Sequence, residues 1–467
     1  MSGAAGPLLA ALARARLAGQ RLVAVSIGPA QLAGVREFGA QLAGVIAVVP
    51  AGGPDLAPET GDVLWLAGSG REIFQHVVDG FAATLARERA AVAGFLGRVD
   101  PDARAAVISY LPVPQDIFGA RPVWGQDSAL CRALEDKGSA ALGSVLPTPR
   151  WLPLRWPCEA KQWAAYQAEL GTGVLVVQAL GLSGGGTGTR ICEDFAAATL
   201  RVPGLGSGPL RVAARVPGEP CNVMGLVTGE GGVLVLPPSR QLVGGDASGC
   251  PVYAGNRFEA GDFTAQERGA IAGEVRRCGQ MLGQRGFHGP FGLDFLRVDA
   301  GTRVYHDLNP RMNGAAMVLA EIVGDPAFAL PAVLLSRPGS EALRSLEDAL
   351  VSAVAGRPRW RWFVADVVAE ARTIAAVPPA GLWQIAADGP VARWCGDSGA
   401  IDDEHALLSA TLAPGTRLMA GERVVLGDLS CTPALGRALL AAHGERAAAR
   451  LLAAMFAASC PTGQAWP

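Results

Sequence analysis

The stretch 291-FGLDFLRVDAGTRVYHDLNPRMNG-314 alternates apolar and polar residues on both sides of a DAGT turn and then breaks at Asn-Pro-Arg. This pattern predicts a β-hairpin with its tip at residues 300–301. The numbers of paired residues in such a hairpin have a constant sum, which places Asp294 opposite Asp307. Asn309 is expected on the same face as Asp307, because side-chain direction repeats every two residues along a strand.

Two opposed carboxylates in this hairpin repel one another, and burial increases the cost. A bound cation, a shared proton or a nearby arginine would relieve it. Two carboxylates and a carboxamide oxygen are hard ligands of the kind that Mg²⁺ takes, together with waters and substrate phosphates. A solvent-exposed hairpin with scattered polar residues is the alternative. His306 points away from the acidic face by strand parity and is expected to be structural.

A glycine-rich run, SGGGTGT at 183–189, follows the buried-type strand GVLVVQA. Successive glycines let backbone N–H groups point at an anion, and the hydroxyls add further donors. The run is neither a Walker A loop nor a G-x-G-x-x-G fingerprint. It predicts a phosphate cradle, although a flexible surface loop would have the same composition.

Lysine is almost absent: Lys137 and Lys161 are the only two lysines among the forty basic residues. Where arginine is the default cation, a remaining lysine suggests a task that arginine cannot perform. Beside a triphosphate, the Lys137 ammonium would supply a compact point charge. An ordinary exposed helix lysine is the alternative.

The chain of 467 residues is half hydrophobic and 18% charged, with a net charge of −2. This length predicts about two to four domains. The absence of a basic tract argues against nucleic acid as a partner, and no apolar run approaches the roughly 20 residues that span a membrane. Nine cysteines without a C-x-x-C pair suggest reduced thiols. We therefore expect a soluble cytoplasmic protein whose partners are small molecules.

Three regions follow from the pattern of strands and helices. Residues 1–125 predict an α/β layer with a partly parallel sheet, 126–335 a core of strands and helices, and 336–467 an α+β appendage. Within the core, Thr264 and Glu267 form a T-x-x-E capping box at the start of a helix, and Ile271, Val275, Cys278 and Leu282 make its one apolar stripe.

Together these motifs resemble the ATP-grasp superfamily. The resemblance is carried by the lysine at DKG, the strand feeding a glycine-rich loop, a further strand ending in VPG, and G-x-D-F followed by D-x-N-P-R. It implies an ATP-grasp core at 126–335 with a small lid subdomain at about 147–215, preceded by the family's pre-ATP-grasp domain. NPRMNG, followed by a long C-terminal region, looks most like the pheganomycin-type peptide ligases.

The resemblance implies that Asp294, Asp307 and Asn309 bind Mg²⁺, with Mn²⁺ as an alternative, and that Arg311 steadies the γ-phosphate of ATP. It assigns nucleotide contacts to Lys137, Gln178, Ser183, Gly184, Gly185, Gly186, Thr187 and the backbone of Arg215 and Val216. The last two are expected in the strand before Pro217 and would pair with adenine.

Three positions depart from the family's pattern. Gln178 stands where the family usually has a second lysine, alanines replace a glutamate in the hinge strand, and Asp307 replaces the family's metal glutamate. Substrate contacts are expected at Gln241 and Asn256, for which an ordinary connecting loop is the alternative. Asn313 and Gly314 are further substrate candidates.

The implied activity is an ATP-dependent carboxylate–amine ligase that forms an acyl phosphate and joins an amino acid or guanidino acid to an amine or peptide in specialised metabolism. The alternatives are an ATP-grasp carboxylase that activates bicarbonate, a kinase, and a catalytically inactive nucleotide-binding module. A homodimer would be unsurprising.

Overall fold

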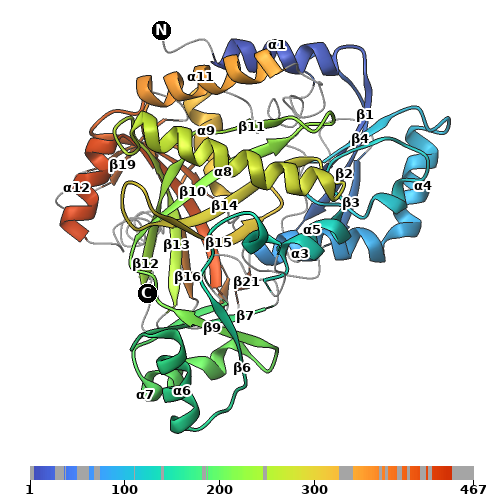
Figure 1. The fold of residues 1–467 in the computed structure, drawn as a ribbon. Helices are drawn as coiled ribbons and strands as arrows, with labels where there is room; N and C mark the ends of the chain where they lie inside the picture. Colours follow the sequence, from blue (N-terminus) through green and yellow to red (C-terminus); the bar gives the residue numbers. More distant parts are fainter. Residues whose placement is uncertain are drawn as a thin grey trace.

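The computed structural model describes residues 5–26, 36, 38–49, 63–67, 74–109, 111–137, 141–180, 186, 188–245, 250–324, 340–367, 371–373, 377–385, 392–396, 400–410, 417–418 and 423–443. Its strands form three sheets and one isolated strand pair (Figure 1). No helix in this described part of the chain is both long and apolar enough to cross a membrane.

The first sheet is parallel and has the order β3-β2-β1-β4-β5. Its strands are β1 (Arg21–Ser26), β2 (Gln41–Val49), β3 (Val63–Ala67), β4 (Ala106–Ile108) and β5 (Val123–Trp124). Helices α1 (Ala5–Leu17), α3 (Phe74–Arg87) and α4 (Arg89–Val99) accompany it. Val23 packs with α3 and α4, whereas its neighbour Leu22 packs with α1. Both faces are therefore covered, as parallel sheets require, and the predicted N-terminal α/β layer is confirmed.

The second sheet is small and antiparallel, with the order β6-β9-β7-β8. Its elements are β6 (Trp151–Leu154), α6 (Ala160–Leu170), β7 (Leu175–Ala179), β8 (Thr189–Cys192), α7 (Phe195–Arg201) and β9 (Leu210–Ala214). It projects from the rest of the molecule at the bottom of Figure 1 and has its own core around the buried Trp163.

The third sheet has eleven strands in the order β15-β14-β10-β12-β13-β16-β22-β20-β18-β19, with β11 paired to β10. The strands are β10 (Glu219–Val227), β11 (Val233–Val235), β12 (Ser239–Gly245), β13 (Pro251–Phe258), β14 (Gly289–Arg297), β15 (Arg303–Asn309), β16 (Arg359–Val367), β18 (Gly381–Ile385), β19 (Ala392–Gly396), β20 (His405–Ala410) and β22 (Arg423–Cys431). Because β13 pairs with β16, the sheet runs without a break from the core into the C-terminal region. The proposed domain boundaries stay a prediction.

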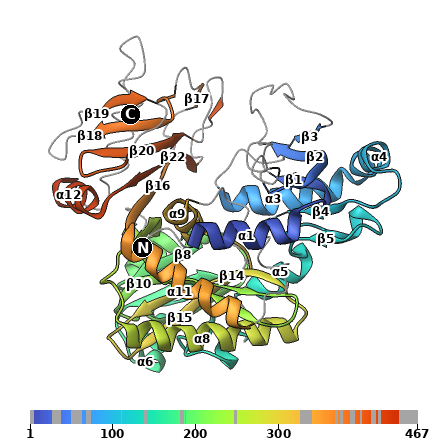
Figure 2. The same ribbon diagram turned by 90° about the horizontal axis from the view of Figure 1, so that it is seen from above.

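Helices cover both faces of the core half of this sheet. The helices are α5 (Ser128–Glu135), α8 (Ala265–Gln284), α9 (Gly314–Val323) and α11 (Ser340–Gly356), while α12 (Pro433–His443) lies beside β16 in the C-terminal half. Val223 of β10 packs in the cluster of α8, and its neighbour Met224 packs in that of α9 and α11. In Figure 2, α1 and α9 lie between the parallel sheet and the C-terminal strands. The remaining elements are β17 (Arg372–Thr373), β21 (Arg417–Leu418) and the 3₁₀ turns η2 (Gln115–Phe118), η3 (Leu142–Ser144) and η4 (Val202–Leu205).

The helix predicted from the capping box is α8. Thr264 accepts a hydrogen bond from the backbone N–H of Glu267, and the Glu267 side chain accepts one from the backbone N–H of Thr264. Two orphan N–H groups of the first turn are thus satisfied. The predicted apolar stripe, Ile271, Val275, Cys278 and Leu282, is buried against the sheet.

We expect Gly225→Ala to lower the free energy of unfolding by about 1–3 kcal/mol, since overpacking a dense core forces its neighbours to move. An added Cβ on this β10 residue would lie 2.5 Å from Cζ of Phe291 and 2.6 Å from Cγ1 of Val275. Gly229→Ala is the matched control, because nothing lies within 4 Å of its Cβ position. Urea denaturation of both variants tests this, and equal effects would contradict it.

Candidate active site

The hairpin that decides the fold is β14–β15, and Asp294 pairs with Asp307 as predicted. The turn differs from the prediction: Arg297 pairs with Arg303, so the turn is centred on Ala300 alone. A bulge at His306 then adds the one residue that restores the expected register. The predicted pairing of the acidic residues is confirmed. The predicted turn tip at residues 300–301 was wrong, because the turn is centred on Ala300 and not between Ala300 and Gly301.

Asp294 is surrounded by amide donors from three strands. Its Oδ1 accepts hydrogen bonds from Nδ2 of Asn222 (2.5 Å) and Nε2 of Gln241 (3.0 Å), and its Oδ2 accepts one from Nδ2 of Asn309 (3.1 Å). Desolvation, followed by the charge of Asp307, nevertheless raises the pKa of Asp294 to about 6. The carboxyl pair thus carries an electrostatic cost that a bound cation would remove.

The donor set suits a hard divalent cation that also takes oxygens from a ligand. Two carboxylates are few for an all-protein cage, and no three or more His, Cys, Asp or Glu side chains among the described residues are grouped so that they could hold a metal ion. Mg²⁺ commonly uses one or two carboxylates and completes its octahedron with waters and phosphates. The amide oxygen of Asn309 accepts a hydrogen bond from Arg311 (3.1 Å), so this side chain connects Asp294 to Arg311.

Lys137 lies two residues beyond the end of α5 and reaches the metal strands. Its Nζ is 3.2 Å from Oδ2 of Asp307, and only 5% of the Lys137 side chain is exposed. The alternative of an ordinary exposed lysine is therefore wrong. The buried ammonium provides a positive charge directly beside the carboxyl pair.

Arg311 is buried in an ion pair that the sequence did not predict. Its Nη2 lies 2.8 Å from Oε1 of Glu135, and the two side chains are 6% and 7% exposed. Burial raises the pKa of Glu135, whereas Arg311 opposes that shift. A weak signal was present, because Glu135 lies one turn after the buried Cys131 on the apolar face of α5.

Gln178, at the end of β7, pairs across the ladder with Arg211 of β9. The Arg211 Nε and Nη2 both donate to Oε1 of Gln178, at 3.0 and 2.6 Å, and its Nη1 donates to the backbone oxygen of Lys137. The guanidinium lies 3.8 Å above the ring of Trp151. Arg211 was missed because nothing in the sequence indicates that β7 pairs with β9.

The glycine-rich loop is described only in part. Ser183, Gly184, Gly185 and Thr187 lie outside the described residues. Gly186 has a φ of 83°, and a Cβ there would collide with the backbone oxygen of Pro251. Its own oxygen accepts a hydrogen bond from Sγ of Cys250 (3.0 Å). The loop therefore reaches the start of β13 in the large sheet.

Arg215 and Val216 lie in the connection between β9 and β10, past the strand end at Ala214. The expectation that they sit within the strand was wrong. The backbone N–H of Arg215 donates to the oxygen of Val174 (3.0 Å). These residues form the crossing from the small sheet to the large one.

The substrate candidates lie in β12, in β13 and at the start of α9. Gln241 contacts Asp294 directly, as described above. The buried Asn256 donates to the Ser239 hydroxyl (2.9 Å) and accepts from the Tyr253 hydroxyl. Asn313 caps α9 by accepting a hydrogen bond from the N–H of Ala315.

Gly314 begins α9, and a Cβ there would collide with the Tyr253 hydroxyl and lie 2.8 Å from the ring of Phe363. Two aromatic rings from β13 and β16 therefore close off this side of the helix start. Half-buried His306, the bulge residue, has a pKa lowered to about 4 by desolvation. The structural role expected for it stays a prediction.

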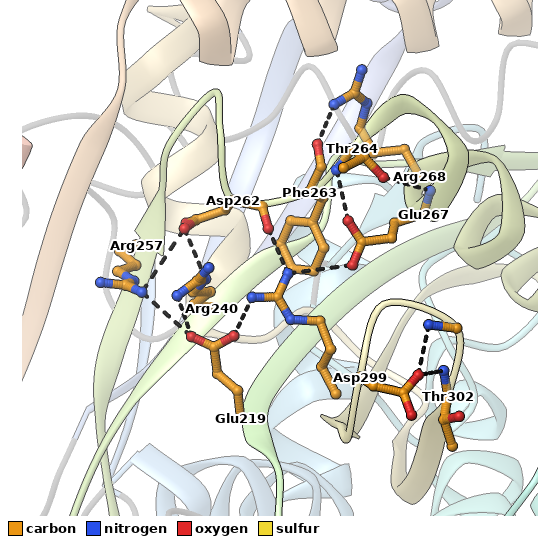
Figure 3. A network of polar contacts seen from close by, with 12 residues as sticks. Glu219, Arg240, Arg257, Asp262, Phe263, Thr264, Glu267, Arg268, Asp299 and Thr302 are labelled. Carbon is orange, nitrogen blue, oxygen red and sulfur yellow. Dashed lines mark hydrogen bonds and ion pairs between the residues drawn. The ribbon is translucent and has the colours of Figure 1, made fainter.

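A network of charged side chains holds the first residue of β10 (Figure 3). Glu219 accepts hydrogen bonds from three arginines, Arg240, Arg257 and Arg297. Arg240 also pairs with Asp262 at 2.7 Å. The network stabilises the end of the connection that contains Arg215 and Val216.

No protein-family model matches the sequence, and no curated protein matches it. Solved structures do resemble the fold. Carboxyaminoimidazole ribonucleotide synthase from Aspergillus clavatus, in complex with ATP, is 12% identical with a TM-score of 0.53, covering 93% of this chain and 98% of that one.

Two further structures show the same likeness. A biotin carboxylase–ATP complex from Campylobacter jejuni is 11% identical with a TM-score of 0.57, covering 88% of this chain and 86% of that one. N5-carboxyaminoimidazole ribonucleotide synthetase from Thermus thermophilus is 14% identical with a TM-score of 0.52, covering 95% of this chain and the whole of that one. At this level of identity the likeness is one of architecture, and the architecture of this chain is the ATP-grasp fold.

Proposed function

We propose that the protein is an ATP- and magnesium-dependent ligase that joins a carboxylate to an amine through an acyl phosphate. The carrying observation is the paired Asp294 and Asp307, with the Lys137 ammonium 3.2 Å from Asp307. Similar structures bind ATP, ADP or MgADP, which supports the same ligands here. The pheganomycin-type assignment, with an amino acid or guanidino acid as the substrate, belongs to this proposal.

Asp294, Asp307 and Asn309 would hold the magnesium ion, which neutralises phosphate charge and orients the nucleotide when bound. Lys137 would exchange its contact with Asp307 for a phosphate oxygen of ATP. Arg311, fixed by Glu135, would neutralise the phosphoryl group during transfer. No covalent bond to the protein is needed, because positioning and electrostatics carry the reaction.

The atoms balance over two steps. An oxygen of the substrate carboxylate attacks the γ-phosphorus of ATP, the bond to the β-phosphate oxygen breaks, and ADP leaves. The nitrogen of the amine then attacks the acyl carbon and the carbon–oxygen bond to phosphate breaks. The products are an amide, inorganic phosphate and a proton.

A carboxylase is the second candidate, because the similar structures named above are carboxylating enzymes or their domains. Bicarbonate would then be the acid, and carboxyphosphate would replace the acyl phosphate. The same metal and phosphate residues would serve both reactions. Only the acceptor and the acid differ.

We expect Mg-ATP and hydroxylamine to give ADP and a hydroxamate with one class of organic acid from a panel of amino acids, guanidino acids and short peptides. Asp307→Asn protein is the matched control and should give neither product. ADP release that depends on bicarbonate, with no hydroxamate from any organic acid, would instead favour the carboxylase. Failure of Mg-ATP to bind would contradict both candidates.

A further inference from the structure

Arg211 is a half-buried cation whose direct partners are neutral groups. Its partners are the amide oxygen of Gln178, the backbone oxygen of Lys137 and the face of Trp151. The carboxylates that act on its charge are those of Asp307 and Asp136, and neither of them accepts one of these three hydrogen bonds. Burial lowers the pKa of Arg211 to about 10. A cation that is partly removed from water and hydrogen-bonded only to neutral groups is costly, so the site favours an anion.

The guanidinium has donors left for that anion. A guanidinium has five N–H groups, and Gln178 and Lys137 accept three hydrogen bonds from it. Among the described residues no acceptor takes the remaining two, which can make a forked contact with phosphate or carboxylate oxygens. The ring of Trp151 covers one face of the guanidinium, which leaves its edge for the ligand.

The location of Arg211 identifies the anion. Its Nη1 contacts the backbone of Lys137, the residue whose ammonium touches Asp307, and Asp307 is the carboxylate that acts most strongly on Arg211. Lys137 and Arg211 are thus neighbours, and the carboxylate of Asp307 acts on both. Arg211 belongs to β9 of the small sheet, whereas Asp307 belongs to the large sheet. A ligand that lies against both Arg211 and Asp307 must therefore lie between the small sheet and the large sheet.

We propose that Arg211 binds the phosphate chain of the nucleotide and that Gln178 is the positioning residue that aims its guanidinium. This inference rests on the proposed function. Gln178 uses its oxygen for Arg211, and its amide nitrogen lies 3.4 Å from the Thr189 hydroxyl. The amide of Gln178 therefore does not itself replace the charge of the lysine that the family usually has at this position. The positive charge comes from Arg211 on the neighbouring strand β9.

The test is isothermal titration of Mg-ATP, with adenosine measured in parallel as the ligand without phosphates. We expect Arg211→Gln to weaken Mg-ATP binding by about tenfold to a hundredfold, as a lost charged hydrogen bond should, and to leave adenosine binding unchanged. Arg211→Lys keeps the charge and should retain most of the affinity. Arg150→Gln is the matched control, because this arginine is exposed and pairs with Glu169 outside the site.

A double-variant cycle isolates the role of Gln178. Gln178→Ala alone should weaken Mg-ATP binding, but it should add nothing in a protein that already carries Arg211→Gln. Returning the charge to the other strand, with Arg211→Gln and Gln178→Lys together, should recover part of the affinity. A purely structural pair would show neither the dependence on phosphate nor this recovery.

The outcomes separate the two proposals. If the unmutated protein binds Mg-ATP and Arg211→Gln binds it equally well, the inference is overturned and the proposed function stands. Equal losses for adenosine and Mg-ATP would also overturn it, because the variant would then have damaged the whole site. If the unmutated protein does not bind Mg-ATP, both fail together. Thermal melts of each variant confirm folding, and Arg211→Lys tests the charge if Arg211→Gln does not fold.

Discussion

Asp294→Asn is expected to reduce ATP-dependent product formation about a thousandfold, while raising the free energy of unfolding of the ligand-free protein by about 1 kcal/mol. The loss follows because one of two carboxylates that would hold the metal disappears. The gain follows because the folded chain no longer opposes two half-buried charges at Asp294 and Asp307. Amide donors that now contact Asp294 would be less well matched, which limits the gain.

The sign of the pH dependence follows from the same pair. The pKa of Asp294 in the folded protein is about 6, above its ordinary value of 3.8. The folded state therefore binds this proton more readily than the unfolded state does. The ionised Asp294 lowers the free energy of unfolding, and this destabilisation is fully present above about pH 7. It declines as the pH falls through 6 toward 4. The stability advantage of Asp294→Asn should accordingly shrink between pH 7.5 and pH 5.

Urea denaturation at both pH values, alongside an ADP-release assay, measures the two effects on one preparation. An Asp294→Asn protein that is less stable than the unmutated protein at pH 7.5 would contradict the electrostatic account. Undiminished turnover would contradict the metal assignment. The two conclusions are independent, because stability is measured without nucleotide or metal.

Glu135→Leu is expected to cost about 3–5 kcal/mol of unfolding free energy, because it leaves the charge of Arg311 buried without its carboxylate partner. Replacing both residues, with Glu135→Leu and Arg311→Met, should recover most of that stability, since neither charge then remains. Product formation should not recover, because the guanidinium that would face the phosphoryl group is gone.

Chemical denaturation of the single and double variants, each assayed for ADP release, tests this expectation. A cost below about 1 kcal/mol for Glu135→Leu would mean that the pair contributes little to folding. Recovered turnover in the double variant would remove Arg311 from the proposed phosphoryl-transfer site.

The acidic hairpin could be predicted because its information is local. Alternation, a turn and a break at Asn309-Pro310 all lie within one short stretch, and together they bring Asp294 opposite Asp307. Periodicity does not reveal the bulge at His306. Near the turn the numbers of paired residues sum to one less than predicted, and the bulge adds one residue to β15. The two shifts cancel, so the predicted pairing of the acidic residues was still correct.

Contacts between distant elements were beyond the sequence. Glu135 and Arg311 are far apart along the chain, as are Gln178 and Arg211, and each pair exists only because of how strands and helices are ordered in space. The neutral residue in β7 suggested a lost charge. Sheet order supplies that charge from β9, which no local pattern indicates.

The unbroken ladder from β13 to β16 has a mechanical consequence. We expect the large sheet to move as one rigid unit, because it is continuously hydrogen-bonded from the acidic strand β15 at one edge to β19 at the other. Bending the C-terminal strands away from the hairpin would require breaking backbone hydrogen bonds along a whole strand. Among the described residues no strand of the small sheet pairs with a strand of the large one, and residues 215–218 connect β9 to β10 (Figure 1). We therefore expect relative motion of the two sheets to be concentrated at this connection, near which Arg211 of the small sheet contacts the backbone oxygen of Lys137.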